Sequence, residues 1–515
     1  MNAHPLTVGI LILYLLILIV IGAMSSRKSA GGLTDFFLAG RNLNKFTVAL
    51  SAVSSGRSSW LVLGVTGTAF ATGLNAVWAI TGYITMEVFM FFYVARRFRI
   101  FSEQTDSITI PDILENRYGD RLKLLRITSS IIIIFFMVAY VGSQIVGGGT
   151  AFSSSLGISV TNGMWLTAAI ILLYTMLGGF HAVSKTDVLQ ACFMFLSLVV
   201  LPIIAIIELG GIGPIIDALA SEGGGFTNLW LFGFGAIAGL LGIALGSPGN
   251  PHILVRYMSL KNVKEMRQAA MIGTVWNVIM GWGAIWVGLS GRAFFESVDA
   301  LPNANSEALF TSLGEELLNP FFMGILLVAV LAAIMSSADS QLLVGASAAV
   351  RDIFDKLFAK EKDIPQKKLV LYSRLSIVVI MALSVWLAFS AQEFVFWMVL
   401  FAFGGLGACF GPVLLLTFYW KRTTGPGVLA GMIFGLLTVI LVKKQPEWTF
   451  SFLPDMKQLS ADLLFGITYE AVPGFLVAAL ATVVVSFMTK KPVQADKMID
   501  QLNYGEIERK DHKAS

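Results

Sequence analysis

The residues best suited to chemistry in this sequence lie inside long apolar segments. One segment, 46–71, carries a run of small and polar residues near its middle: Ser51, Ser54, Ser55, Gly56, Arg57, Ser58 and Ser59. Lipid cannot satisfy hydrogen-bonding groups, so a helix with this run must turn it toward the protein interior. The helix can also be broken there, because unwound backbone is tolerated at membrane depth where it lines a cavity.

Among the ionisable residues in or at the edge of apolar segments, four are candidates for function: Arg57, Glu87, Asp187 and Asp339. A charge at membrane depth is costly unless it is paired or hydrated, and it is a functional candidate by default. Glu87 is the nearest candidate anion for Arg57. Asp187 could instead cap a helix at the cytoplasmic interface, and Asp339 could make a structural hydrogen bond.

The elements that position these residues are apolar helices. Hydrophobic residues make up 56% of the 515 residues and charged residues only 13%, a balance that excludes a soluble domain. We find about 13 segments long enough to cross a hydrocarbon core of roughly 30 Å. They are 6–26, 46–71, 74–96, 127–150, 162–180, 187–210, 230–247, 268–291, 320–350, 369–391, 394–418, 425–443 and 470–488.

The distribution of basic residues predicts the orientation of these segments. With the N-terminus outside, most of the 36 Lys and Arg fall in cytoplasmic segments, as expected for membrane proteins. The odd number of crossings then places the C-terminus in the cytoplasm. The sequence therefore predicts one multi-pass domain, 1–490, in the cell inner membrane and a cytoplasmic tail, 491–515.

Six motifs, in order along the chain, carry a resemblance to a known family. They are Phe37-Leu38-Ala39-Gly40-Arg41, Trp60-Leu61-Val62, Thr109-Ile110-Pro111-Asp112, Tyr174 to Phe180 with Ala182-Val183-Ser184 and Thr186-Asp187, Pro251-His252-Ile253-Leu254 with Arg256, and Met335 to Leu343. With them the chain resembles the sodium:solute symporter family, especially its bacterial sodium/proline branch. The resemblance covers roughly 10–490. It implies an all-α LeuT-type core of two inverted five-helix repeats, about 46–210 and 230–418.

The resemblance also implies a sodium site. In it, the carbonyl oxygens of Ser54 and Arg57 and the hydroxyls of Ser336 and Ser337 bind Na⁺. Sodium is a hard cation that exchanges its hydration water for oxygens, so such groups suit it. The alternative is that each serine bonds back to a carbonyl of its own helix, which is common in membrane helices.

A second group is implied further along. The family places the equivalent of Asp187 near the sodium exit path, or at a second ion site together with Ser340 and its neighbour Asp339. The number of sodium ions moved with each solute stays open.

The expected solute cavity departs from the proline symporters. Gly56 replaces an Asp, Arg57 replaces an apolar residue, and Ile243 and Ser247 stand where those symporters have Trp and Tyr. These departures leave the solute open. The expected cavity residues are Arg57, Ser58, Glu87, Tyr140, Ser247 and Pro251, although Tyr140 could equally be a core residue.

Arg57 and Glu87 have three interpretations. They can form a structural ion pair, or they can grip the carboxylate and ammonium of a zwitterion. In the third, the guanidinium stands in for a cation, and the protein runs on protons or without coupling.

The expected function is sodium-coupled uptake of a small organic solute, proline or another amino acid, by alternating access. The alternative is a proton-coupled or uncoupled transporter of a small organic anion on the same fold. The expected partners are the solute and membrane lipid. No basic patch indicates nucleic acid, and no protein partner is evident. The sequence has no metal-spacing cluster, nucleophile elbow or phosphate loop, which argues against an enzyme, and its tail is too short for a sensor's output domain.

Overall fold

The computed structural model describes residues 4–223, 225–230, 233–359, 364–390, 395–448, 469–492, 498–500 and 502. Within these ranges the regular structure is helical, and extended pairing is limited to one bridge between Leu43 and Leu260. The longer helices are α1 (Pro5–Ser26), α3 (Lys45–Ser59), α5 (Val77–Phe89), α8 (Leu124–Leu156), α9 (Val160–Glu208), α13 (Met266–Gly291), α15 (Pro320–Ser347), α16 (Gln366–Ser390), α17 (Val395–Tyr419), α18 (Gly425–Trp448) and α20 (Ala471–Met488). The shorter helices are α2 (Leu33–Leu38), α4 (Thr66–Thr72), α6 (Ala95–Gln104), α7 (Ile110–Tyr118), α10 (Gly213–Ser221), α11 (Gly233–Gly242), α12 (Pro251–Ser259) and α14 (Leu309–Leu317). Most of the expected tail, 491–515, lies outside the described residues.

Ten helical segments in the described ranges are long and apolar enough to cross a membrane. Two of them are at least twice as long as the roughly 20 residues that one crossing needs. They are Lys45–Gln104, with 60 residues, and Val160–Glu208, with 49. Each contains a glycine with positive φ, Gly73 (φ 64°) and Gly179 (φ 53°). At both positions an added Cβ would also collide with backbone, so glycine is needed. These breaks lie close to the ends of the expected segments 46–71 and 162–180.

Several helices begin where the sequence supplies a polar side chain to cap them. Asn44 accepts a hydrogen bond from the Thr47 amide (3.0 Å) at the start of α3. Asn319 accepts from two amides at the start of α15, where Pro320 occupies the first turn. Such caps satisfy backbone donors that the first helical turn leaves unpaired.

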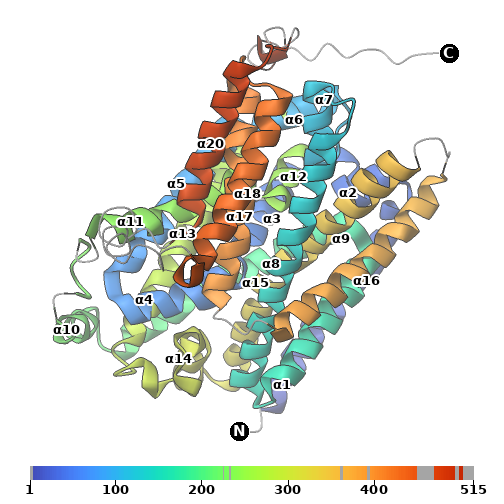
Figure 1. Ribbon diagram of the computed structural model, residues 1–515. Coiled ribbons are helices and arrows are strands. Elements are labelled where there is room, and N and C mark those ends of the chain that lie inside the picture. Colours follow the sequence, from blue (N-terminus) through green and yellow to red (C-terminus); the bar gives the residue numbers. More distant parts are fainter. Residues whose placement is uncertain are drawn as a thin grey trace.

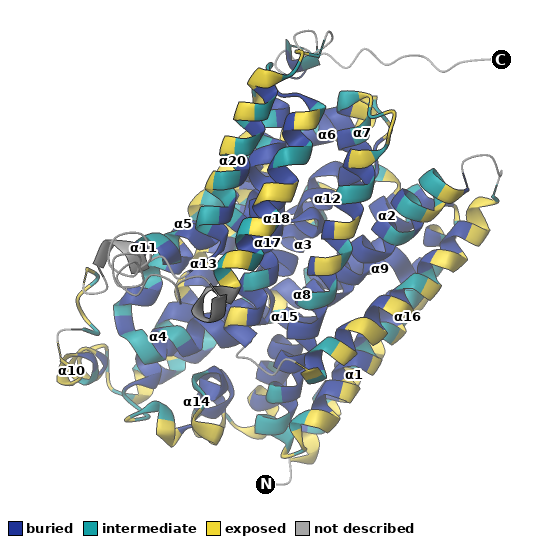
Figure 2. Ribbon diagram, viewed as in Figure 1, coloured by how far each residue is buried: buried dark blue, intermediate teal, exposed yellow. Residues whose placement is uncertain are grey.

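The interior and the periphery of the bundle differ in burial. Helices α3, α12 and α15 are buried along nearly their whole length, whereas α1, α16, α18 and α20 keep one side exposed (Figure 2). Helix α15 packs against α9, α8, α3 and α1. The polar residues of α3 and α15 therefore meet inside the protein.

Two of the inner segments are interrupted. Helix α3 breaks at Ser58 (φ 47°, ψ −172°) and continues as a π-helical turn, η3 (Trp60–Val65), and α4. Helix α11 passes through a 3₁₀ turn, η6 (Ile243–Gly249), and an extended residue, Asn250, into α12. The side-chain amide of Asn250 holds this break against α17, because it donates to the carbonyl oxygens of Gly246 (2.8 Å) and Phe403 (3.0 Å).

The two ends of the bundle carry different short helices. In Figure 1, α10 and α14 lie at the end where the chain begins, and α7 lies at the opposite end. Helix α7 belongs to the connection 97–126, which carries six Lys and Arg, and α14 to the connection 292–319, which carries one.

Candidate functional site

Two pairs of oxygens meet where α15 passes the break in α3. The Ser336 hydroxyl donates to the Ser54 carbonyl oxygen at 3.2 Å, and the Ser337 hydroxyl donates to the Ser55 carbonyl oxygen at 2.8 Å. All four residues are fully buried. The donor set consists of neutral oxygens from two elements distant in sequence, which suits a hard monovalent cation.

The Arg57 carbonyl oxygen lies on the same turn but has another partner. It accepts the backbone N–H of Trp60, just beyond the break. Ser336 also donates to the carbonyl oxygen of Ala333 in its own helix (3.2 Å). The Ser55 carbonyl, absent from the sequence prediction, is thus the group that faces Ser337.

The Arg57 side chain runs toward α5 and α13. Its guanidinium carbon lies 4.0 Å from the centre of the Tyr83 ring, and its Nη2 donates to the Asn277 carbonyl oxygen at 3.5 Å. Its Nε and Nη1 have no hydrogen-bond partner among the described residues. The Tyr83 ring therefore stabilises the Arg57 guanidinium through a cation–π contact.

Glu87 is tied to the same group through Asn277, whose side-chain amide donates to the Glu87 carboxylate. In the described ranges no ion pair within 4.0 Å joins Arg57 to Glu87. An ideal Cβ on Gly56 would lie 2.6 Å from the Tyr83 hydroxyl and 3.1 Å from Glu87 Oε1. A residue larger than glycine at 56 would thus displace this cluster.

A small, partly open cavity with room for about one water molecule adjoins the break in α3. Its lining residues are Gly56, Trp60, Tyr83, Tyr140, Ile243, Val399, Leu400 and Phe403. The Tyr83 ring stacks with Trp60 (5.4 Å between centres) and with Phe403 (5.8 Å). The cavity is mostly apolar, and its lining residues bring two tyrosine hydroxyls and the indole N–H of Trp60 as polar side-chain groups, a pattern usual for small-solute sites.

The expected cavity residues are distributed over several places. Tyr140 lines the cavity. The Ser58 hydroxyl accepts from the Trp60 amide, and the buried Ser247 hydroxyl has no partner in the described ranges. Pro251 lines a different small cavity, next to α7. Arg57 and Glu87 are not among the residues that line the cavity beside the break in α3.

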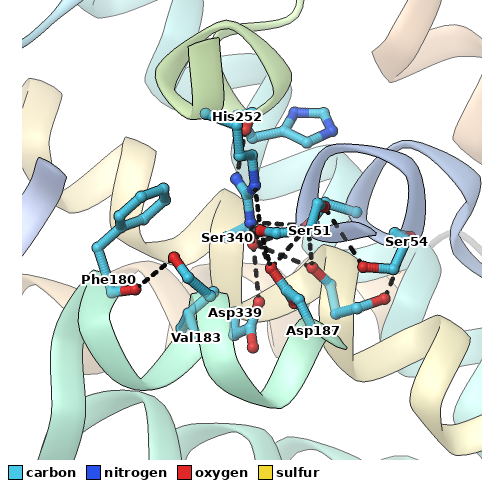
Figure 3. A network of polar contacts seen from close by, with 12 residues as sticks. Ser51, Ser54, Phe180, Val183, Asp187, His252, Asp339 and Ser340 are labelled. Carbon is cyan, nitrogen blue, oxygen red and sulfur yellow. Dashed lines mark hydrogen bonds and ion pairs between the residues drawn. The ribbon is translucent and has the colours of Figure 1, made fainter. Parts of the chain in front are cut away.

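Asp187 lies in a second polar cluster, between α3, α9, α12 and α15 (Figure 3). Its Oδ2 accepts from Arg256 Nη2 (2.9 Å), the Ser51 hydroxyl (2.5 Å) and the Ser55 hydroxyl (3.3 Å). The side chains of Asp187 and Arg256 are both fully buried. Figure 3 shows Asp187 pointing toward Ser51, away from the backbone of its own helix. In this arrangement Asp187 is the partner of a buried cation rather than a helix cap.

Asp339 is attached to the edge of this cluster. It accepts hydrogen bonds from the Tyr174 hydroxyl (2.8 Å) and from the Ser340 hydroxyl (2.9 Å). Ser340 in turn accepts from Arg256 Nη2. Asp339 therefore reaches the guanidinium through Ser340.

A third charged cluster lies at the α7 end of the bundle. Arg126 in α8 forms ion pairs with Asp112 (2.7 Å), Glu115 and Asp352 (2.5 Å). Burial alone would raise the pKa of Asp112, but Arg351 and Arg126 hold that pKa below its ordinary value. The cluster joins α7 and α8 to η11 (Ala348–Phe358), the π-helical end of α15.

Comparison with known proteins identifies the family of this chain. Residues 36–435 match the sodium:solute symporter family. The chain is 37% identical over 480 residues to the high-affinity proline transporter PutP of Bacillus subtilis, covering 92% of this chain and 96% of that protein. It is 36% identical over 496 residues to the sodium/proline symporter of Staphylococcus aureus strain JH9, covering 95% and 94%.

This chain belongs to the sodium:solute symporter family. It is therefore a sodium-coupled solute transporter and not an enzyme. The expected resemblance is confirmed, and Na⁺ is the coupling ion.

Solved structures show the fold of this symporter. A Na⁺-coupled sialic acid symporter in a substrate-bound outward-open state superposes with a TM-score of 0.77 at 17% identity, covering 95% of this chain and 99% of that one. Mhp1, a nucleobase-cation-symport-1 family transporter, superposes with a TM-score of 0.53 at 13% identity, covering 91% and 98%. The symporter therefore has the all-helical transporter fold that the resemblance implied.

Several residues of the symporter's clusters escaped the sequence prediction. Arg256 appeared there only within a motif, because its partner Asp187 is 69 residues away. Trp60, Tyr83 and Phe403 line the cavity, but aromatic residues in apolar helices are usually core residues. Gln144 accepts hydrogen bonds from the backbone amide (3.2 Å) and the hydroxyl (2.9 Å) of Ser59, beside the break in α3. Its position as a lone glutamine in an apolar segment was the one sequence feature that could have indicated this role.

Proposed function

We propose that this chain is a sodium/proline symporter that takes up proline by alternating access. The observation that carries the proposal is the meeting of Ser54 and Ser55 with Ser336 and Ser337 beside a small apolar cavity. The names of the two relatives at 36–37% identity, a proline transporter and a sodium/proline symporter, support the choice of solute.

The proposed sodium ion binds at the break in α3. The hydroxyls of Ser336 and Ser337 and the carbonyl oxygens of Ser54 and Ser55 would hold it, and the Arg57 carbonyl oxygen is the next candidate on the same turn. Rotation of the two hydroxyls would turn their lone pairs toward the ion. This step breaks two hydrogen bonds between α3 and α15 and replaces them with contacts to one ion, so binding holds the two helices together.

The proposed solute would bind at the apolar cavity, whose walls would have to move apart to admit it. The pyrrolidine ring of proline would pack against Tyr83, Tyr140 and Phe403, and its charged groups would face the unwound backbone at Ser58. Ile243, in place of the Trp of other proline symporters, would be one wall. Ser58, Ser247 and Pro251 would act by shaping the backbone around the cavity.

For Arg57 and Glu87 we favour a structural role. Their contacts run to Tyr83 and Asn277, and the cavity is lined by other residues. In this arrangement Arg57 fixes the Tyr83 ring, which forms part of the cavity wall.

The proposed topology has thirteen crossings in the inner membrane, with the N-terminus outside and residues 491–515 in the cytoplasm. The two long helical segments with internal breaks would each cross twice, and the apolar stretch Ile237–Gly249 with α12 would cross once. Residues 46–210 and 230–418 would form the two inverted repeats, each of which begins with an interrupted helix. The six Lys and Arg in the connection around α7, against one in the connection around α14 at the opposite end of the bundle, fit this orientation.

The decisive experiment is uptake of radiolabelled proline by the purified protein in proteoliposomes. Uptake should require an inward sodium gradient. A panel of other amino acids and small carboxylates, tested as competitors, defines the solute. Equal uptake in potassium buffer with a pH gradient would instead favour the proton-coupled anion transporter, and preferred uptake of another solute would overturn proline.

A further inference from the structure

A carboxylate oxygen at the α7 end of the bundle lacks a partner. Asp352, in η11, is fully buried. Its Oδ1 accepts hydrogen bonds from the Thr109 hydroxyl (2.7 Å) and from Arg126 Nη1 (2.5 Å). Its Oδ2 has no hydrogen-bond partner among the described residues. An unsatisfied buried carboxylate oxygen is costly, so an oxygen of this kind is normally matched by an ion or an ordered water molecule.

A small cavity bordered by three polar side chains lies beside this carboxylate. It is the cavity next to α7, and it has room for about one or two water molecules. Its polar lining residues are Thr109, Ser347 and Asp352. The Ser347 hydroxyl donates to the Val344 carbonyl oxygen (2.8 Å), and the Thr109 hydroxyl donates to Asp352. Both hydroxyl oxygens can therefore still accept a contact from a cation.

The ion-paired residues around the cavity carry an excess of negative charge. Two guanidinium groups pair with four carboxylates there, Arg126 and Arg351 with Asp112, Glu115, Asp352 and Asp355. When all the carboxylates are ionised, two negative charges are in excess. A monovalent cation near Asp352 Oδ2 would offset part of this excess. Sodium is a hard cation that prefers carboxylate and hydroxyl oxygens such as these.

Hydroxyl groups on α15 lead from the proposed sodium site to this cavity. Ser336, Ser340 and Ser347 are spaced by four and seven residues, so they share one face of the helix. Another small cavity is lined by Ser340 and Ser347, and Ser347 also lines the cavity at Asp352. This series of oxygens ends at the α7 end of the bundle (Figure 1), which faces the cytoplasm in the proposed topology.

We propose that Asp352, Thr109 and Ser347 form a release site for sodium, which the ion occupies after it leaves the break in α3 and before it enters the cytoplasm. The proposal rests on the sodium-coupled function proposed above and adds the last step of the ion's route. Because one ion occupies the two sites in turn, the release site does not raise the number of ions moved with each solute.

The composition of the release site suits an ion that must leave again. One carboxylate and two hydroxyls are few protein oxygens for a sodium ion, so water has to complete its coordination and the affinity is low. The positive charge of Arg126, on the other oxygen of Asp352, weakens the attraction further. An ion that passes through several sites needs each of them to be weak enough to leave.

The release site also gives the motif Thr109-Ile110-Pro111-Asp112 a function. Thr109 supplies one of the hydroxyls, and the same hydroxyl caps α7 by accepting the Asp112 amide (3.1 Å). The Asp112 carboxylate in turn pairs with Arg126 (2.7 Å). The start of α7 thus holds Thr109 and Arg126 in place around Asp352.

The test compares sodium acting from the two sides of the membrane. Proline transport by the full-length protein is measured in right-side-out and inside-out membrane vesicles. Sodium from the cytoplasm would have to be captured first at the release site. Asp352→Asn should therefore raise the cytoplasmic sodium concentration for half-maximal efflux at least roughly 10-fold, and Ser347→Ala should raise it roughly threefold. The outer sodium concentration for half-maximal uptake should stay nearly unchanged in both variants.

A matched control lies at the same end of the bundle. Ser130→Ala removes a buried hydroxyl of α8 that donates to the Arg126 carbonyl oxygen (2.7 Å) and does not line the cavity, so it should change neither concentration. A purely structural role of Asp352 would lower transport at every sodium concentration on both sides. That result, or an unchanged cytoplasmic dependence in the folded variants, would overturn the release site. If Asp352→Asn does not fold, Ser347→Ala decides. Transport that needs no sodium in the unmodified protein would refute the proposed function instead.

Discussion

The hydroxyl of Ser337 in α15 donates a 2.8 Å hydrogen bond to the carbonyl oxygen of Ser55 in α3, across 282 positions of the chain. The neighbouring Ser336 reaches Ser54 in the same way. Two consecutive hydroxyls thus face two consecutive carbonyl oxygens where α3 is about to break. This relationship leads to the first prediction.

Ser336→Ala and Ser337→Ala should each weaken sodium binding. Each substitution removes one oxygen from the proposed site, and a bond to a charged group is worth roughly 1.5–3 kcal/mol. The sodium concentration for half-maximal uptake should therefore rise roughly 10- to 100-fold. Ser373→Ala, which removes a buried hydroxyl bonded to Leu369 in α16, is the control and should change little. Unaltered sodium dependence in both variants would refute the site.

Arg57→Met and Glu87→Gln should each reduce the amount of folded protein in the membrane. Each substitution leaves the other buried charge without an opposite charge nearby, which costs about 3–5 kcal/mol. Removal of both charges is often nearly neutral. The double variant should therefore recover both folding and proline uptake. Glu103→Gln, at the half-exposed end of an ion pair with Arg99, is a control expected to cost less than about 1 kcal/mol.

The double variant also separates the two interpretations of Arg57 and Glu87. If these residues grip a zwitterion, it should fold but fail to bind proline, because the solute loses both charge partners. If both single variants fold and transport normally, neither interpretation survives.

Arg126→Met should strongly destabilise the α7 end of the bundle. It leaves the buried carboxylates of Asp112 and Asp352 without the guanidinium between them, at a cost of about 3–5 kcal/mol. Thermal unfolding of the purified protein would measure the loss. Arg121→Met, an exposed arginine in the same connection, should leave the melting temperature nearly unchanged, and equal melting of both variants would contradict the prediction.

Glu307→Ala should loosen the start of α17. The Glu307 carboxylate accepts the backbone N–H groups of Phe396 (2.7 Å) and Val395 (3.1 Å), so it caps this helix from a distant connection. Loss of a helix cap costs about 0.5–2 kcal/mol. The melting temperature should fall, while Glu316→Ala, at an exposed position nearby, should have little effect. A melting temperature unchanged in Glu307→Ala would show that the cap does not stabilise α17.

Much of the architecture and the class of function followed from the sequence, because lipid imposes simple rules. A helix must be apolar for about 20 residues to cross, and basic residues favour the cytoplasmic side. The run from Ser51 to Ser59 had to face inward for the same reason, and the structure buries all of it. Six motifs, among them Trp60-Leu61-Val62 and Met335 to Leu343, indicated the family.

The partners of the buried side chains were decided only by tertiary structure. Arg57 and Glu87 have opposite charges, yet they meet through Asn277 of α13 and the Tyr83 ring, since helix packing fixes where long side chains end. Asp187 pairs with Arg256, and Ser337 faces Ser55 rather than Arg57. Periodicity and hydropathy report how far each helix is buried, whereas distances between side chains of different helices depend on crossing angles and on breaks such as the one at Ser58, which arise when the helices pack.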